Sequence, residues 1–364
     1  MVKKVVLKCH LIVFWVWGLS NNRAGTEHVI DTYCRASPSA KFDFLCYEAP
    51  VNYEHLFASG VNRYYVIPIK IKHPIAYERA LRSFAKDHID EYKMIWCNIN
   101  DISNIDILSA ARNVMNIPIR CVHMHSSSIP DVPVTKLFSY LNRKKLFKVA
   151  NQFWACSHSA GDFLYSSYDY EVIPNLVDDK HVSFSEEKRN LVRSHYGIEN
   201  SLVIGNVGRL TEVKNQSHLI KLLHMLVSSG RDAVLMLVGE GELEGKLRDY
   251  ADGLGLGSRV IFTGGQSDVQ AYYSAMDVAA FPSLFEGLSI AILEAQFNGL
   301  PCVLSSGISS EVRISSSCDF VDLDNLAEWQ NCILNATRER QLLLPAADAF
   351  RCARASVLAG KMFN

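Results

Sequence analysis

Two glutamates, Glu286 and Glu294, lie eight residues apart around the start of an apolar, helix-like run at 288–297. A glycine and a proline follow this run and predict its end. Because eight residues make about two helical turns, both carboxylates can face one crevice. Carboxylates accept hydrogen bonds from sugar and ribose hydroxyls, so the pair is a candidate site for a sugar nucleotide. Taken alone, the two residues also fit an ordinary amphipathic helix with solvated acids.

The backbone at the start of this predicted helix offers a second kind of contact. The N–H groups of Gly287, Leu288 and Ser289 come before the first helical turn closes, and such groups attract anions. A diphosphate bound there would lie beside the glutamates. The stretch therefore combines acceptors for hydroxyl groups with donors for phosphate.

Two basic residues extend this pattern in the segment GRLTEVKN, residues 208–215. The segment follows a strand-like run at 202–207 and precedes a helix-like run at 216–227, so Arg209 and Lys214 lie at the mouth of a strand–loop–helix unit. Charge-assisted hydrogen bonds from such cations to a diphosphate are worth roughly 1.5–3 kcal/mol each. Two solvated cations on a loop are the plainer alternative.

In their order along the chain, these pieces resemble the retaining GT-B glycosyltransferases of family 4, in particular those that build bacterial capsule, exopolysaccharide and O-antigen. The resemblance is strong over residues 203–311 and weaker over the first half. The segments that carry it are Gly208-Arg209 with Lys214-Asn215, Val238–Gly241, Phe281–Ser283, Glu286–Ser289 and Glu294-Ala295.

The resemblance implies a role for each matched residue. Arg209 and Lys214 would stabilise the departing diphosphate. Glu294 would bind the ribose, and Glu286 would contact the hydroxyls of the donor sugar or its developing positive charge. Gly239 would leave room beside the nucleotide. The implied mechanism proceeds on one face of the sugar, with the leaving phosphate taking the acceptor's proton and no side chain acting as a covalent nucleophile.

Two other patterns point to different chemistry, and each has a feature that argues against it. The loop GEGELEG at 239–245 imitates a dinucleotide fingerprint, but its three glutamates would repel a pyrophosphate, and no acid for a ribose follows the next strand. Asp322 and Asp324 match the D-x-D metal pair of an unrelated glycosyltransferase class, but they follow all the nucleotide-type elements. We interpret both aspartates as helix-capping carboxylates. We expect no cofactor and no metal requirement.

The first half offers candidates for the acceptor side. A loop at 18–27 opens into a helix that extends to about residue 36, at a place where the family usually has paired glycines followed by an acid. This chain has Gly25 and Glu27, but Ala24 stands at the first glycine position, which weakens the expected close approach of the backbone to a phosphate. Glu27 either contacts the acceptor or only favours the helix start through its charge.

His123 and His125 end a strand-like run at 119–125, and ligands of open parallel sheets bind beyond such strand ends. The family has a histidine near this place that faces the donor sugar and the acceptor, and His125 is the better match because it is last on the strand. A hydrogen-bonded histidine with a structural role is the alternative. The family's other common histidine is missing, since residues 96–100 read WCNIN.

Composition limits the class of protein. At 364 residues, with 49% hydrophobic and 21% charged residues, the chain is long enough for two domains with large cores. Residues 1–175 hold 20 Lys and Arg against 15 Asp and Glu, and the remainder hold 17 against 23. This asymmetry is too small for a nucleic-acid-binding protein, although a mildly basic first half suits an anionic lipid surface.

Strand-like and helix-like runs alternate along the chain, which predicts an α/β protein with parallel sheets covered on both faces. In the first half we expect strands at 42–46, 64–67, 94–97, 119–125, 153–156 and 170–173, and helices at 75–89, 103–115 and 134–149. A second alternation runs from 201 to about 321, after a helix at 186–196. The resemblance implies the GT-B fold, and the two alternations agree with its two Rossmann-like domains facing each other across a cleft.

We place an N-terminal, acceptor-side domain at 1–177 and a C-terminal, nucleotide-sugar domain at 178–345. A helical tail at 346–364 could return to the N-terminal domain. The apolar stretch 5–19 imitates a signal peptide, but Lys8 and His10 interrupt it, so we expect a buried first strand. Ten scattered cysteines without a zinc-type cluster predict reduced core residues in a cytoplasmic protein.

The segment KLFSYLNRKKLFK, residues 136–148, has a helical pattern with both apolar and basic character. Its apolar residues gather toward one side and are Leu137, Phe138, Leu141 and Phe147. Its basic residues are Lys136, Arg143, Lys144, Lys145 and Lys148. This pattern is typical of a helix that lies on an anionic membrane. The alternative is an ordinary sheet-covering helix whose apolar stripe faces the core.

We therefore predict a retaining glycosyltransferase. Its donor would be a nucleotide sugar, in our interpretation a UDP-sugar, and its acceptor a hydroxyl of a growing, lipid-linked surface polysaccharide. We expect it to be cytoplasmic, with peripheral contact to the inner face of the membrane. Two rivals share the fold: a sugar-nucleotide 2-epimerase, which needs no acceptor, and a catalytically inactive subunit that binds a nucleotide sugar.

Overall fold

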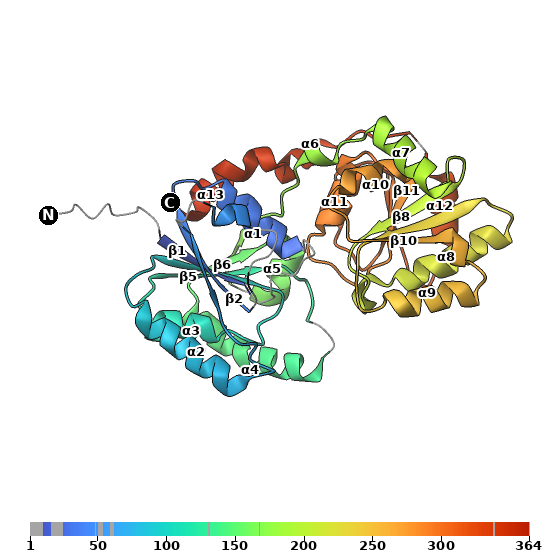
Figure 1. Ribbon diagram of the computed structural model, residues 1–364. Helices are drawn as coiled ribbons and strands as arrows, with labels where there is room; N and C mark the ends of the chain where they lie inside the picture. The colour runs from blue at the N-terminus through green and yellow to red at the C-terminus, as the bar shows by residue number, and fades with distance from the viewer. Residues whose placement is uncertain are drawn as a thin grey trace. The chain divides into compact units, whose positions relative to one another are not determined.

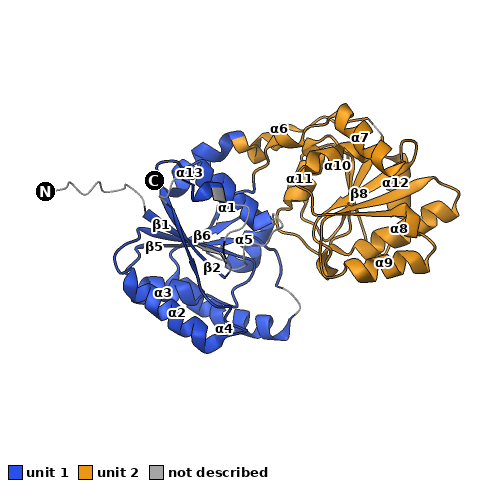
Figure 2. Ribbon diagram, viewed as in Figure 1, with its two compact units in different colours: residues 1–175, 353–364 blue, residues 176–352 orange. Residues whose placement is uncertain are grey.

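The computed structural model describes residues 10–15, 25–47, 49, 54–58, 62–129, 132–166, 168–337 and 339–363 (Figure 1). The chain divides into two compact units (Figure 2). Unit 1 contains residues 1–175 and 353–364, and unit 2 contains residues 176–352. Unit 1 is therefore assembled from two separate parts of the sequence.

Unit 1 is built on a parallel sheet of seven strands in the order β3-β2-β1-β4-β5-β6-β7. The strands are β1 (His10–Trp15), β2 (Lys41–Cys46), β3 (Arg63–Val66), β4 (Met94–Ile99), β5 (Ile119–Met124), β6 (Gln152–Ala155) and β7 (Glu171–Val172). All six residues of β4 are buried, as a central strand covered on both faces requires. The parallel α/β architecture predicted from the alternating pattern is confirmed.

Helices cover both faces of this sheet. They are α1 (Gly25–Arg35), α2 (Pro74–Asp87), α3 (Asp106–Asn113), α4 (Pro133–Val149), α5 (His158–Tyr165) and α13 (Ala355–Phe363). Helices α2, α3 and α4 lie on one face, and α1 and α13 lie on the other (Figure 1). Within the core, the ring of Phe363 on α13 meets those of Phe42 and Trp96 edge-on, with centroids 5.3 and 5.4 Å apart. The last described helix thus completes the core of unit 1.

Unit 2 contains a second parallel sheet, with six strands in the order β10-β9-β8-β11-β12-β13. The strands are β8 (Leu202–Val207), β9 (Ala233–Val238), β10 (Val260–Gly264), β11 (Val278–Phe281), β12 (Cys302–Ser305) and β13 (Cys318–Val321). The helices are α6 (Asp179–Val182), α7 (Glu186–Tyr196), α8 (Gln216–Ser228), α9 (Glu244–Gly253), α10 (Val269–Ala275), α11 (Ile290–Phe297) and α12 (Leu326–Asn335). Apolar side chains of α8, α9 and α12 share one buried cluster with the strands.

Several predicted bounds need adjustment. The strand expected at 119–125 ends at Met124, so His125 is the first residue of the following loop. The helix expected from residue 288 begins at Ile290, and the first strand occupies only 10–15 of the apolar stretch 5–19, whose flanks lie outside the described residues. Among the described residues, no helix is both long and apolar enough to span a membrane.

Each sheet has a point where the chain changes its direction of travel across the strands. In unit 1 this point lies between β1 and β4, and in unit 2 it lies between β8 and β11. Loops that leave neighbouring strands at such a point run apart and leave room for a ligand at the carboxyl edge of the sheet. The candidate residues follow β1, β4, β5, β8, β9 and β11, at the carboxyl edges of the two sheets.

Gly239, directly after β9, allows two of these loops to approach each other closely. Its φ is +139°, and a Cβ atom added to it would lie 2.2 Å from the carbonyl oxygen of Gly208. We predict that Gly239→Ala lowers the free energy of unfolding by about 1–3 kcal/mol, because the loop must shift. Gly245→Ala is the matched control: Gly245 lies in α9 with open space around it, so this change should add up to about 1 kcal/mol. Equal urea midpoints for the two variants would contradict this assignment.

Candidate functional site

In unit 2, the loops after β8 and β11 are joined directly. The backbone N–H of Leu284 donates to the carbonyl of Val213 at 2.8 Å, and the side-chain amide of Asn215 donates to the carbonyl of Pro282 at 3.3 Å. These bonds hold the short helical turn Glu212–Lys214 against the turn that precedes α11. The two sequence motifs that predicted a sugar-nucleotide site therefore form one structure.

Lys214 and Glu286 form an ion pair at this junction. The ammonium nitrogen of Lys214 donates to Oε1 of Glu286, and the hydroxyl of Ser283 donates to the same oxygen at 2.9 Å. Both charged side chains are largely shielded from solvent, with 22% of the lysine and 12% of the glutamate exposed. A partly buried cation with a fixed position can neutralise a developing negative charge more strongly than a mobile surface lysine.

A buried amide network, which the sequence analysis did not find, sets the course of the loop after β8. The side-chain amide of Gln216 donates to Oδ1 of Asn206 at 3.2 Å and to the carbonyl of Arg209 at 2.9 Å. Asn206 in turn donates to the carbonyl of Ala280 on β11 at 2.8 Å. The network ties β8, its loop and β11 together, and the side chain of Arg209 extends from it as an exposed cation. In the sequence, this network is indicated by two polar residues, Asn206 and Gln216, that stand near the predicted cations.

Gly239 has a local structural role that the sequence did not indicate. The space that its missing side chain leaves is occupied by the backbone of Gly208, since an added Cβ would meet that carbonyl oxygen. Its own N–H donates to the carbonyl of Gly264 at 2.9 Å. Gly239 therefore sets the distance between loops, and contact with a nucleotide stays a prediction.

Glu294 is the fifth residue of α11, little more than one turn after the loop that contains Glu286. The hydroxyl of Tyr273 lies 3.0 Å from Oε2 of Glu294 and 3.1 Å from the carbonyl of Ala291, so it can donate to either. Burial raises the pKa of the Glu294 carboxyl to about 7, and the Tyr273 hydrogen bond opposes this rise. Tyr273 is itself buried and positions the carboxylate.

The residues Gly287, Leu288 and Ser289 precede the first turn of α11, as the sequence predicted, and all three are buried. Ser289 is the N-cap residue, and its side chain makes no capping hydrogen bond. The backbone at this helix start therefore lies beside the Lys214–Glu286 pair in sequence and structure. Anion binding by these amides stays a prediction.

In unit 1, His125 follows β5 and faces the neighbouring strand β4. Its Nε2 lies 2.9 Å from Oδ1 of Asn98, while its buried Nδ1 has no hydrogen-bond partner. Burial lowers the pKa of His125 to about 3, so the ring is neutral at physiological pH. With Nε2 donating to Asn98, Nδ1 is a hydrogen-bond acceptor. Asn98 lies in the segment that lacks the family's other histidine, and its pairing with His125 could not be read from the sequence.

His123 is the structural histidine of the two. It is fully buried, receives a hydrogen bond from the indole nitrogen of Trp96 at 3.3 Å and contacts the carbonyl of Ile173 through Nε2 at 3.1 Å. Its ring lies 4.1 Å from that of His125, centroid to centroid. His123 therefore packs under His125 and restricts its orientation.

Gly25 and Glu27 begin helix α1 in unit 1. Gly25 is exposed at the first position, and Glu27 in the first turn is only 3% exposed. The position of Glu27 fits both the helix-start role and the acceptor role, and the second stays a prediction. Ala24, at the altered glycine position, lies outside the described residues.

The metal alternatives can be compared with the structure. Asn325, not an aspartate, caps α12, because its side chain accepts the N–H of Glu328; Asp322 instead accepts the N–H of Asp324 within the preceding turn. The capping role predicted for the two aspartates is therefore wrong. Among the described residues, one group has metal-ligand geometry, namely His10, Asp43 and Glu91 in unit 1. The guanidinium of Arg63 pairs with both of its carboxylates, which makes it an ion-pair network.

Comparisons with known proteins agree with this geometry. The sequence profile described as "Glycosyl transferases group 1" matches residues 188–314, which include the Lys214–Glu286 pair and Glu294. The chain is 30% identical over 303 residues to the putative glycosyltransferase EpsF of Bacillus subtilis, covering 80% of this chain and 78% of that protein. It is 31% identical over 177 residues, 47% of this chain and 46% of that one, to the Escherichia coli UDP-Gal:alpha-D-GlcNAc-diphosphoundecaprenol alpha-1,3-galactosyltransferase.

The fold also matches a solved structure. HepE of Anabaena, crystallised with UDP and glucose, superposes with a TM-score of 0.72 at 19% identity, covering 98% of this chain and 96% of that one. At this identity the likeness concerns the fold alone, and it confirms the GT-B class predicted from the sequence.

The raised pKa of Glu294 predicts a pH-dependent stability. In the unfolded chain this carboxyl titrates near its ordinary value of about 4.3, whereas burial raises the native pKa to about 7. The native state therefore holds the proton more tightly, and its stabilising effect is complete below about pH 4.3 and is lost as the pH rises through 7. Without ligand, the melting temperature of the wild type should fall relative to that of Glu294→Gln as the pH rises from about 4.3 to about 7. Above pH 7, the melting temperatures of the two proteins should differ by a constant amount. Parallel curves across the whole range would contradict the assigned pKa.

Proposed function

The chain belongs to the group 1 glycosyltransferases, which are nucleotide-sugar-dependent enzymes, and from this premise we propose its donor, acceptor and stereochemistry. The donor is a UDP-sugar, the acceptor is a hydroxyl of a growing, lipid-linked surface polysaccharide, and the anomeric configuration is retained. The observation that carries the proposal is the Lys214–Glu286 pair, fixed by Ser283 at the start of α11. HepE, which binds UDP and glucose, and the E. coli enzyme, whose name specifies a UDP-sugar donor and a diphosphoundecaprenol-linked acceptor, support the choice of both substrates.

The donor diphosphate would be held by unit 2. Lys214 and Arg209 supply positive charge, and the amides of Gly287–Ser289 supply donors at the start of α11. Glu294, positioned by Tyr273, accepts hydrogen bonds from the ribose hydroxyls. Glu286, close to Lys214, contacts the sugar hydroxyls or the positive charge that develops at the anomeric carbon.

The transfer proceeds on one face of the donor sugar. The bond between the anomeric carbon and the diphosphate oxygen breaks, the acceptor oxygen bonds to that carbon on the same face, and the acceptor's proton passes to the leaving phosphate. The protein's contribution is electrostatic, because Lys214 and the helix start lie where negative charge develops. In unit 1, the unpartnered Nδ1 of His125 can accept a hydrogen bond from a sugar hydroxyl. Glu27 and Gly25 contribute to the acceptor side.

Removal of the lysine tests the donor assignment. We expect Lys214→Ala to lower transfer from a UDP-sugar by about two to three orders of magnitude, since one preorganised transition-state contact is lost. Lys246→Ala is the matched control, because Lys246 is exposed on α9 and contributes only to the surface. Transfer rates and melting temperatures should be measured for both variants.

The same assay separates the rival functions. Near-normal transfer by a folded Lys214→Ala variant would contradict the site. Conversion of the sugar nucleotide without an acceptor would identify an epimerase, and binding without transfer or hydrolysis would identify an inactive subunit.

Contact with a membrane is proposed from helix α4. Val134, Leu137, Phe138 and Leu141 follow the i, i+3, i+4, i+7 spacing of one helix face, and all four are exposed, Leu137 and Leu141 by more than half. The alternative, in which this stripe faces the core, is wrong for these residues. Phe147 does not belong to the stripe, because it stacks on Tyr168 with centroids 3.7 Å apart. An exposed apolar stripe next to several lysines fits the surface of an anionic bilayer.

Vesicle binding tests this surface. We expect the double variant Leu137→Gln and Leu141→Gln to bind phosphatidylglycerol vesicles at least about ten-fold more weakly than the wild type, because two apolar side chains no longer enter the interface. Ile75→Gln is the matched control, since Ile75 is 76% exposed on α2, another helix of unit 1. Wild-type binding should weaken as salt is added. Equal sedimentation of the double variant and the control with vesicles would leave α4 as scaffold only.

A further inference from the structure

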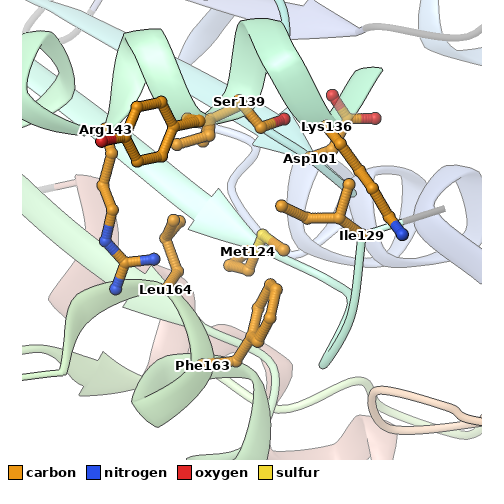
Figure 3. Close-up of a pocket in the computed structure, with 10 residues that line it drawn as sticks. Asp101, Met124, Ile129, Lys136, Ser139, Arg143, Phe163 and Leu164 are labelled. Atoms are coloured by element: carbon orange, nitrogen blue, oxygen red, sulfur yellow. The ribbon is translucent and has the colours of Figure 1, made fainter. Parts of the chain in front are cut away.

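A pocket of about 160 Å³ lies within unit 1 (Figure 3). It opens at the carboxyl ends of β4 and β5, where Met124 immediately precedes His125. Its apolar walls are formed by Ile102, Met124, Ile129, Phe163 and Leu164, which come from both strand ends and from α5. An apolar cavity of about 150 Å³ can hold a molecule of the size of benzene. The pocket therefore suits a small group and not a whole oligosaccharide.

One buried polar atom in this pocket lacks a partner. Ser139 on α4 lines the pocket and is 1% exposed, and its hydroxyl makes no hydrogen bond. An unsatisfied buried hydroxyl costs free energy, so a ligand that bonds to it gains affinity. A purely hydrocarbon group would leave this hydroxyl unsatisfied. A group with one polar atom and one small apolar end fits the pocket better, because it can bond to this hydroxyl and also contact the apolar walls.

The lining of the pocket carries two cations, Lys136 and Arg143, and one carboxylate, Asp101. Figure 3 shows Lys136 and Arg143 on opposite sides of the group formed by Met124, Ile129 and Phe163. The guanidinium of Arg143 donates to the hydroxyl of Ser166 at 3.0 Å, an exposed contact that still leaves this cation at the pocket's edge. Asp101 lies on the same side as Lys136 in Figure 3, so an anion attached to the bound group would lie against Arg143.

The pocket faces away from the exposed apolar stripe of α4. The residues of α4 that line the pocket have the same spacing as those of the stripe, but each stands two residues later in the sequence. They are Lys136, Ser139, Tyr140 and Arg143, against Val134, Leu137, Phe138 and Leu141. Two residues turn a helix by about 200°, so the two sets lie on nearly opposite sides. A lipid chain held at the stripe would not enter the pocket. The sugar end of a lipid-linked acceptor is the better occupant.

We propose that this pocket binds the acetamido group of an acceptor sugar, with the sugar's diphosphate at Arg143. The inference rests on the proposed function, because it specifies the acceptor of the same enzyme. The hydroxyl of Ser139 donates to the amide carbonyl, and the methyl group packs on Met124, Ile129 and Phe163. A sugar with a plain hydroxyl at this position fills less of the pocket and gains less from it.

Two matched probes test the pocket: N-acetylglucosaminyl diphosphate with a short alkyl ester, and the glucosyl compound that is otherwise identical. By calorimetry, the wild type should bind the acetamido probe about ten-fold more tightly, from one hydrogen bond and one buried methyl group. Ser139→Ala should remove most of this preference and leave the affinity for the glucosyl probe unchanged. Its melting temperature should not fall, because the lost hydroxyl had no partner. Ser83→Ala, on the exposed surface of α2, is the control.

A change at the rim should act differently. Arg143→Ala should weaken both probes by a similar factor, about ten-fold, because it removes a contact to the shared diphosphate. Equal affinity of the wild type for the two probes would overturn the proposal, as would a Ser139→Ala variant that keeps the preference. Equal transfer onto both probes would overturn the pocket while the proposed function stands. Preferred binding of the acetamido probe without transfer to either would support the pocket and overturn the proposed acceptor.

Discussion

Parallel strand pairing is the constraint on which the rest of this protein depends. Every strand pair described in the two sheets is parallel, so each loop that follows a strand emerges at the same edge of its sheet. Residues far apart in sequence, such as Lys214 and Glu286, are brought together because their strands, β8 and β11, are neighbours. The same pairing places Asn98 beside His125 in unit 1. Candidate chemistry therefore collects at two sheet edges, and the helices serve to bury the faces.

The charged residues at these edges are held by neutral ones. Ser283 fixes the carboxylate that pairs with Lys214, and Gln216 fixes the loop that contains this lysine. Tyr273 fixes the carboxylate of Glu294. In each case a buried or half-buried hydroxyl or amide restricts a charged side chain without altering its charge. Preorganisation of this kind reduces the rearrangement needed when a diphosphate arrives, which is how a static charge contributes to a rate.

Much of the architecture could be predicted from the sequence, because apolar periodicity reports burial directly. Strand β8 and helix α7 have the bounds that the pattern indicates. The prediction that failed concerns a side-chain partner. The cap of α12 is Asn325 and neither of the predicted aspartates, because such a contact depends on the path of the loop. Likewise the exposure of Leu137 and its neighbours follows from the orientation of α4, which an amphipathic pattern with two possible faces does not specify.

The divided sequence of unit 1 has a consequence for the order in which the protein folds during synthesis. The ring of Phe363 closes on Phe42 and Trp96, so this part of the core waits for a helix that the ribosome makes after the whole of unit 2. Domains generally fold as they emerge, the N-terminal one first. In this protein the order is reversed at the end. When residue 352 has emerged, unit 2 has all its residues, but unit 1 still lacks residues 353–364. The apolar surface that α13 later covers therefore stays exposed on the nascent chain through most of its translation. A chaperone can bind this surface during that period.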